Sequence, residues 1–95
     1  MRYEWDTAKA AANLRLHGVD FVDAIVSLED PNRIEEADDR FDYDEERDIV
    51  IGMSRGGVLF VVLTNRDENT RRIISARKAT KYEEDRYYAG DREIW

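Results

Sequence analysis

The sequence predicts an α+β domain in which an antiparallel meander of strands is flanked by two N-terminal helices and one C-terminal helix. Two observations support this prediction. Segments rich in valine and isoleucine at residues 48–53, 58–66 and 71–76 are separated only by short turns, as in antiparallel hairpins. Segments of helix-forming residues with capping residues precede and follow them. We expect the helices to cover one face of the sheet and residues 1–95 to form one domain.

The N-terminal segment is expected to contain a short strand and two helices. Residues 2–5 alternate polar and aromatic side chains, which is typical of a strand. Asp6 can cap the first helix and Gly18 can end it, whereas Asp20 can cap a second helix over residues 21–28. The expected apolar stripe of the first helix consists of Ala8, Ala11, Ala12 and Leu16.

The acidic middle segment separates these helices from the meander. It is expected to hold a short strand near Ile34 and solvated turns at Asp38, Asp39 and residues 42–46. After the meander, Thr80 and Glu83 have the spacing of a capping box. They predict a last helix that ends at Gly90.

Composition limits the classes of function. The formal net charge is -7, but residues 1–48 carry 6 basic and 15 acidic side chains, whereas residues 49–81 carry 7 basic and 2 acidic ones. The second segment can therefore bind a polyanion although the whole chain is acidic. The absence of cysteine and the single histidine argue against a metal site, and no cofactor is expected. No apolar run is long enough to span a membrane, so we expect a cytoplasmic protein.

Arginines are concentrated in the last strand of the meander. Simple alternation would place Arg71, Ser75 and Arg77 on one face and Arg72 on the other, with Arg66 nearby at the end of the preceding strand. Guanidinium groups can bind phosphate bidentately and stabilise a pentacoordinate phosphorane. Alternatively, these arginines pair with acidic side chains elsewhere, which is common for exposed charges.

His17 also has two interpretations. An imidazole titrates near neutrality, so this side chain could serve as a general acid or base. Its position in the last turn of the first helix, directly before Gly18, equally suits an interaction with the terminal carbonyls and the helix dipole.

Four segments together resemble BrnT-type toxins. WDTAKAAANLRLHGVDF at residues 5–21 resembles the opening W-D-x-x-K-x-x-x-N-x-x-x-H-G-V-x-F of that family. ERDIVIG at residues 46–52, VLFVVLTNR at residues 58–66 and RIISARKAT at residues 72–80 continue the resemblance in order, with a tyrosine in the following helix.

The resemblance implies a RelE-like ribonuclease toxin of a type II toxin–antitoxin module that inhibits translation. It implies metal-independent cleavage of RNA, free or ribosome-associated, in which a 2′-hydroxyl attacks the adjacent phosphate. It also implies a BrnA-type DNA-binding antitoxin, which neutralises the toxin and with it represses their operon. Operator DNA would be contacted only through the antitoxin, and no membrane is involved.

The same resemblance implies the site residues. The expected catalytic residues are His17, Glu46, Arg66, Arg72, Ser75 and Arg77, and the expected RNA-binding residues are Arg47, Arg71, Lys78 and Tyr87. The resemblance leaves the general base open among His17, Glu46 and the basic or tyrosine side chains that sometimes do this work in RelE-like enzymes. The chain departs from the family at Leu16, where a basic residue is usual, and in the acidic start of its last helix. These departures support an alternative function, a weakly active antitoxin-binding module that acts mainly in operon regulation.

Overall fold

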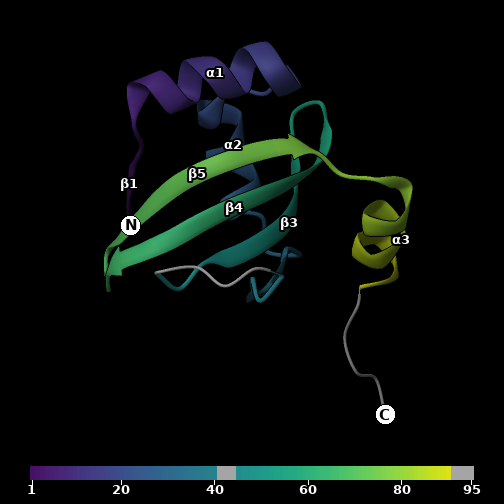
Figure 1. The fold of residues 1–95 in the computed structure, drawn as a ribbon. Coiled ribbons are helices and arrows are strands. Elements are labelled where there is room, and N and C mark those ends of the chain that lie inside the picture. The colour runs from purple at the N-terminus through teal and green to yellow at the C-terminus, as the bar shows by residue number, and fades with distance from the viewer. Residues whose placement is uncertain (41–44, 91–95) are drawn as a thin grey trace.

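The computed structural model describes residues 1–40 and 45–90 (Figure 1). The elements in chain order are β1 (Arg2–Glu4), α1 (Thr7–His17), α2 (Phe21–Leu28), β2 (Ile34–Ala37), β3 (Asp48–Ser54), β4 (Gly57–Asp67), β5 (Thr70–Lys78) and α3 (Lys81–Ala89). This confirms the predicted α+β class and every predicted helix. Of the predicted turn at residues 42–46, residues 42–44 lie outside the described residues. No helix in the described ranges is long and apolar enough to cross a membrane.

The strands form one five-stranded sheet in the order β1-β5-β4-β3-β2. The pairs among β3, β4 and β5 are antiparallel, as predicted. β2 also pairs antiparallel with β3, whereas β1 pairs in parallel with β5 through Arg2–Glu4. The parallel pair joins the start of the chain to a strand that lies far along the sequence.

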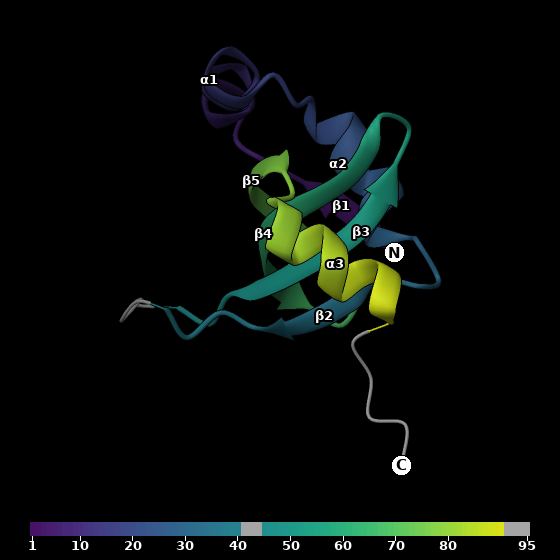
Figure 2. The same cartoon turned by 90° about the vertical axis from the view of Figure 1, so that its right-hand side faces the viewer.

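The helices lie on both faces of the sheet, so the expectation that one face carries all three was wrong (Figure 2). On the α1/α2 face, the core contains Phe21, Val50, Val61, Leu63 and Ile73 with other buried apolar residues. On the opposite face, here called the α3 face, the buried cluster is Ile49, Ile51, Val58, Phe60 and Val62. α3 lies on this face because two apolar side chains pack against that cluster. They are Ala79, which precedes the helix, and Tyr87, which lies within it.

The predicted apolar stripe of α1 was also wrong. Leu16 is 78% exposed, and Ala8, Ala11 and Ala12 are exposed as well. The side of the helix that meets the protein carries Ala10 and the buried Asn13 instead. α1 packs on β5. One edge of β5 pairs with β4, but the other edge has a partner strand, β1, only at residues 70–72. Along the rest of that edge the helix meets unpaired backbone groups as well as apolar side chains.

A register shift in β5 changes which side chains share a face. Val62 pairs with Ser75 and Leu63 pairs with Ile73, so one extra residue, Ile74, lies between these pairs as a bulge. Simple alternation therefore fails. Arg71 shares the α1/α2 face with Ile73, whereas Arg72, Ser75 and Arg77 lie on the α3 face. The predicted grouping of Arg71 with Ser75 and Arg77 was wrong.

Candidate functional site

Arg71 is a buried part of the α1/α2 face. Its side chain is only 7% exposed, and its Nη2 lies 2.6 Å from Glu35 Oε2. Its Nε donates to Asn65 Oδ1 at 3.1 Å. The guanidinium thus links β5 to β2 and β4 within the fold, and it is not exposed at a surface where RNA could bind.

Arg66 and Arg72 share one carboxylate at the end of the sheet formed by the β4–β5 hairpin. Glu4 Oε2 accepts from Arg72 Nη1 at 2.6 Å and from Arg66 Nη1 at 3.4 Å. The single negative charge of Glu4 partly neutralises two guanidinium groups. These two cations therefore attract phosphate less than the sequence alone suggests.

Glu46 lies at the same end of the sheet as Arg66. The two residues line a cleft of about 420 Å³ together with Glu45, Asp48, Thr64 and Asn65. The Glu46 carbonyl accepts a hydrogen bond from Thr64 Oγ1 at 2.8 Å, which fixes its backbone on β4. Three carboxylates against one arginine make the field in this cleft negative, so it disfavours a phosphate group.

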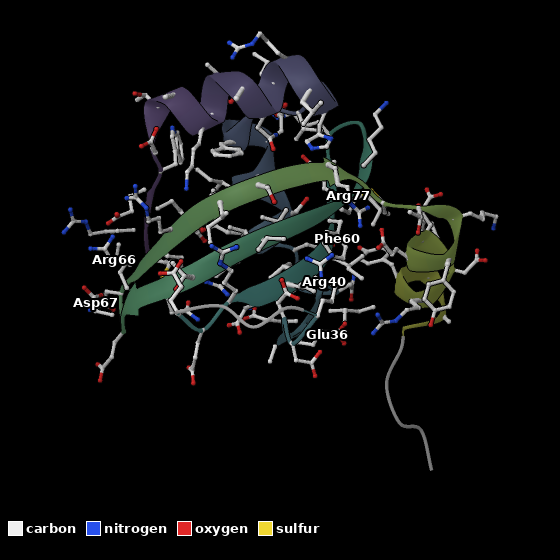
Figure 3. The ribbon with its side chains drawn as sticks, in the orientation of Figure 1. Glu36, Arg40, Phe60, Arg66, Asp67 and Arg77 are labelled. Atoms are coloured by element: carbon white, nitrogen blue, oxygen red, sulfur yellow. The ribbon has the colours of Figure 1, made fainter. Side chains whose placement is uncertain are left out.

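Arg77 lies at the opposite end of β5, against α3. Its guanidinium carbon is 3.9 Å from the centroid of the Phe60 ring, and Arg40 contacts the same ring at 5.2 Å. Figure 3 shows Arg77, Phe60 and Arg40 in a row beside α3 and Arg66 at the far end of the strands. Phe60 is opposite Arg77 in the ladder, and Arg66 lies six positions farther along β4, a distance of about 20 Å. No single phosphate can contact both Arg66 and Arg77.

Glu83 forms a bidentate ion pair with Arg77. Arg77 Nη1 and Nη2 donate to the two Glu83 oxygens at 2.8 and 3.0 Å, and the Thr80 amide donates to Oε1 at 2.8 Å. Burial alone would raise the pKa of Glu83, but these hydrogen bonds outweigh it and hold the pKa below its usual value. The sequence indicated Glu83 only as a helix cap. Its second role requires the fold, because the bulge in β5 decides where Arg77 points.

His17 and Lys78 are carried by two elements, α1 and β5, that meet at the same end of β5 as Arg77. Asn13 is bonded to the backbone of Ala76, and His17 follows Asn13 by one helical turn on the same side of α1. Lys78 follows Ala76 by two residues and lines a small cleft of about 100 Å³ with Gly18, Val19 and Asp23. Within residues 1–40 and 45–90, neither side chain has a carboxylate partner.

We call His17, Arg77 and Lys78 the β5-end cluster. Lys78 pairs with Leu59 and so lies on the α1/α2 face, whereas Arg77 lies on the α3 face. A polyanion that crosses the end of the strand can therefore contact both cations. Ser75 is half-buried on the α3 face between this cluster and Arg72.

The two remaining predicted residues hold loops and helices in place. The Tyr87 hydroxyl donates to Asp30 Oδ2, which also accepts from the Met53 amide at 2.7 Å. Burial and this bond to a carboxylate raise the pKa of Tyr87 to about 12. Arg47 lies with its Nε 3.5 Å from Glu45 Oε1, and its carbonyl accepts from the Asp38 amide at 2.7 Å. In the part of the chain that the structure describes, no three His, Cys, Asp or Glu residues are arranged to hold a metal ion.

Comparisons with known proteins agree with the resemblance found in the sequence motifs. The model of a family described as the ribonuclease toxin, BrnT, of type II toxin–antitoxin systems matches residues 5–83. The chain is also similar to the 1.1 Å crystal structure of the Brucella abortus ribonuclease toxin BrnT, with 25% identity and a TM-score of 0.62 over 85% of this chain and 99% of that chain. No curated protein matched. The family match contains every predicted site residue except Tyr87.

Proposed function

Because the chain belongs to the BrnT family of ribonuclease toxins of type II toxin–antitoxin systems, we propose that it is an endoribonuclease that cleaves RNA without a metal ion and inhibits translation. Its substrate is cytoplasmic RNA, free or on the ribosome. A BrnA-type DNA-binding antitoxin neutralises it, and the two proteins repress their own operon through the antitoxin's contacts with operator DNA.

The proposed reaction site is the β5-end cluster. The observation that carries this assignment is that Asn13 bonds α1 to β5 one helical turn before His17 and two residues before Lys78, at the strand end that holds Arg77. Neither His17 nor Lys78 has a carboxylate ion-pair partner in the described residues. A general acid or base and two cations are the groups that metal-independent phosphodiester cleavage requires. Glu46, the other candidate base, lies beside Arg66 at the opposite end of the sheet. It is therefore not proposed as the base, and it could contact only parts of the RNA distant from the bond that is cleaved.

The reaction follows from these groups. A base removes the proton of a 2′-hydroxyl, whose oxygen attacks the adjacent phosphorus while the bond to the 5′-oxygen breaks. The products are a 2′,3′-cyclic phosphate and a 5′-hydroxyl, which takes up a proton. His17 moves one of these protons, and Lys78 and Arg77 neutralise the charge that develops on the phosphorane oxygens. Ser75, Arg72, Arg66 and Arg47 serve as contacts along a longer RNA.

One structural observation favours a second candidate function, an antitoxin-binding module of weak activity. Arg66 and Arg72 are paired with Glu4, and Arg77 is paired with Glu83. Arg77 must break its ion pair with Glu83 before Nη1 and Nη2 can both bind a phosphate. This exchange of one anion for another lowers the gain from binding RNA.

The test is expression in a bacterial host without the antitoxin, together with cleavage of RNA by the purified protein in EDTA. Wild-type protein should arrest growth and cleave RNA, and Lys78→Ala should lower cleavage by at least about tenfold. The matched control is Lys9→Ala, which removes an exposed lysine from the start of α1. Normal growth with folded protein contradicts the ribonuclease function and leaves the binding module. Equal losses in both lysine variants contradict the location of the site.

A further inference from the structure

The most unusual buried group in the α1/α2 face is Asn13. It is 6% exposed and is the only buried residue of α1 among the described residues. An amide removed from water costs free energy unless its donors and acceptor find partners. The Asn13 Nδ2 donates to the carbonyls of Val19 at 3.0 Å and Ala76 at 2.8 Å, and its Oδ1 accepts from the Ala76 amide at 3.1 Å.

These bonds complete an open edge of the sheet. β1 pairs with β5 only at Thr70, Arg71 and Arg72, so farther along β5 has no strand on that side. An unpaired strand edge leaves its amide and carbonyl groups without partners. The side-chain amide of Asn13 offers one donor and one acceptor to Ala76, as the peptide group of a neighbouring strand would.

The same amide fixes the geometry of the β5-end cluster. Asn13 lies one helical turn before His17 on the same side of α1, and Ala76 lies two residues before Lys78. The bond to Val19 holds the turn that follows the helix, where Gly18 has a φ of 71°. One side chain therefore ties together the end of α1, the turn after it and the end of β5.

We propose that Asn13 is a positioning residue of the ribonuclease site, which completes the edge of β5 and thereby holds His17 beside Lys78. This inference rests on the proposed function for its catalytic consequence. Its structural half, the attachment of His17 to the end of β5, stands on the three hydrogen bonds. Asn13 touches no RNA and acts only through the placement of His17.

The test compares Asn13→Ala with Ser27→Ala. Ser27 is a matched control because it is buried like Asn13 and also donates from a helix to a strand carbonyl, that of Gly52, at 2.9 Å. Both variants lose a buried hydrogen-bonding group, but only Asn13 contacts β5 near the cluster. Both are studied at a temperature where circular dichroism shows that they are folded.

Two NMR measurements and one kinetic measurement are made on each. His17 is the only histidine, so its ring protons give isolated signals. Wild-type protein and Ser27→Ala should show cross-peaks between this ring and the end of β5 and slow exchange of the Ala76 amide. Asn13→Ala should lose both and should lower kcat by at least about tenfold with little change in KM, because the cations that bind RNA remain.

The proposal is overturned if wild-type protein lacks these cross-peaks, if Asn13→Ala keeps them, or if both variants lose activity in proportion to their stability. If wild-type protein cleaves no RNA, the proposed function fails, and the NMR measurements alone decide the positioning role. Loss of the cross-peaks in Asn13→Ala then supports it, and their retention overturns it.

Discussion

Replacing Gly52 with alanine should strongly destabilise the protein, because Gly52 lies where α2 rests on β3. A Cβ atom at this position would lie 2.4 Å from the Ser27 carbonyl oxygen and 3.1 Å from its carbon. Both are backbone atoms of α2, so no side-chain rotation can relieve the clash. Ordinary contact begins near 3.4 Å. The helix must therefore move about 1 Å away from the sheet or β3 must bend.

The size of the effect follows from what such a movement disturbs. Overpacking of a well-packed core costs about 1–3 kcal/mol. The bond from Ser27 Oγ to the Gly52 carbonyl at 2.9 Å is stretched as well, for a further cost of about 1 kcal/mol. We expect the free energy of unfolding to fall by about 2–4 kcal/mol, a large part of the total for a domain of this size.

Urea unfolding followed by circular dichroism measures this loss, and Gly56→Ala is the matched control. No atom lies within 4 Å of a Cβ built at Gly56, and the φ of Gly56 is not positive, so alanine fits its backbone. That variant should stay within about 0.5 kcal/mol of wild type. If the two variants unfold at the same urea concentration, the close contact between α2 and β3 is not real and the reasoning is refuted.

Three further changes test the charged groups. Glu83→Gln should raise RNA affinity several-fold in fluorescence anisotropy because it frees Arg77, and an equal gain in Glu84→Gln would show that only net charge matters. The raised pKa of Tyr87 means that its neutral hydroxyl stabilises the fold fully below pH 10 and progressively less as the pH rises to about 12. Melting curves of Tyr87→Phe should therefore show a smaller alkaline loss than those of wild type, and identical losses would contradict this role. Arg71→Met should lower the free energy of unfolding by about 1–3 kcal/mol, since it removes a buried bond to a carboxylate, and an unchanged urea midpoint would contradict its structural assignment.

The elements of the fold could be predicted because their signals are local. The capping box of Thr80 and Glu83 forms as expected, with both reciprocal hydrogen bonds present. Gly18 and Gly90 end their helices in the left-handed conformation that the sequence indicated. The short connections between β3, β4 and β5 left only an antiparallel arrangement possible.

The side on which each residue lies could not be predicted, because it depends on contacts between distant segments. The bulge at Ile74 shifts the register of one strand and separates Arg71 from Ser75 and Arg77. No residue type in RRIISAR requires a bulge there. The motif that includes Asn13 gives no role for its side chain, because its partner Ala76 is 63 positions away.

The candidate site could be predicted only in part, because its residue types are local but their partners are distant in the sequence. The arginines of β5 were identified by their type, but Arg72 pairs with Glu4 across 68 positions and Arg71 with Glu35 across 36. These pairs decide which cations can meet a phosphate. The attachment of α1 to the end of β5 that carries Lys78 followed from no spacing in the sequence, since it depends on how α1 lies along β5.

The parallel pairing of β1 with β5 also bears on how the protein is made. Arg2 pairs with Thr70, so β1 has no partner strand until residues 70–72 have been synthesised. Closing so long a loop is entropically costly and slows folding. A nascent chain that stops before Thr70 lacks β5 and therefore lacks Arg77 and Lys78. A translation product interrupted before Thr70 thus carries no assembled cluster.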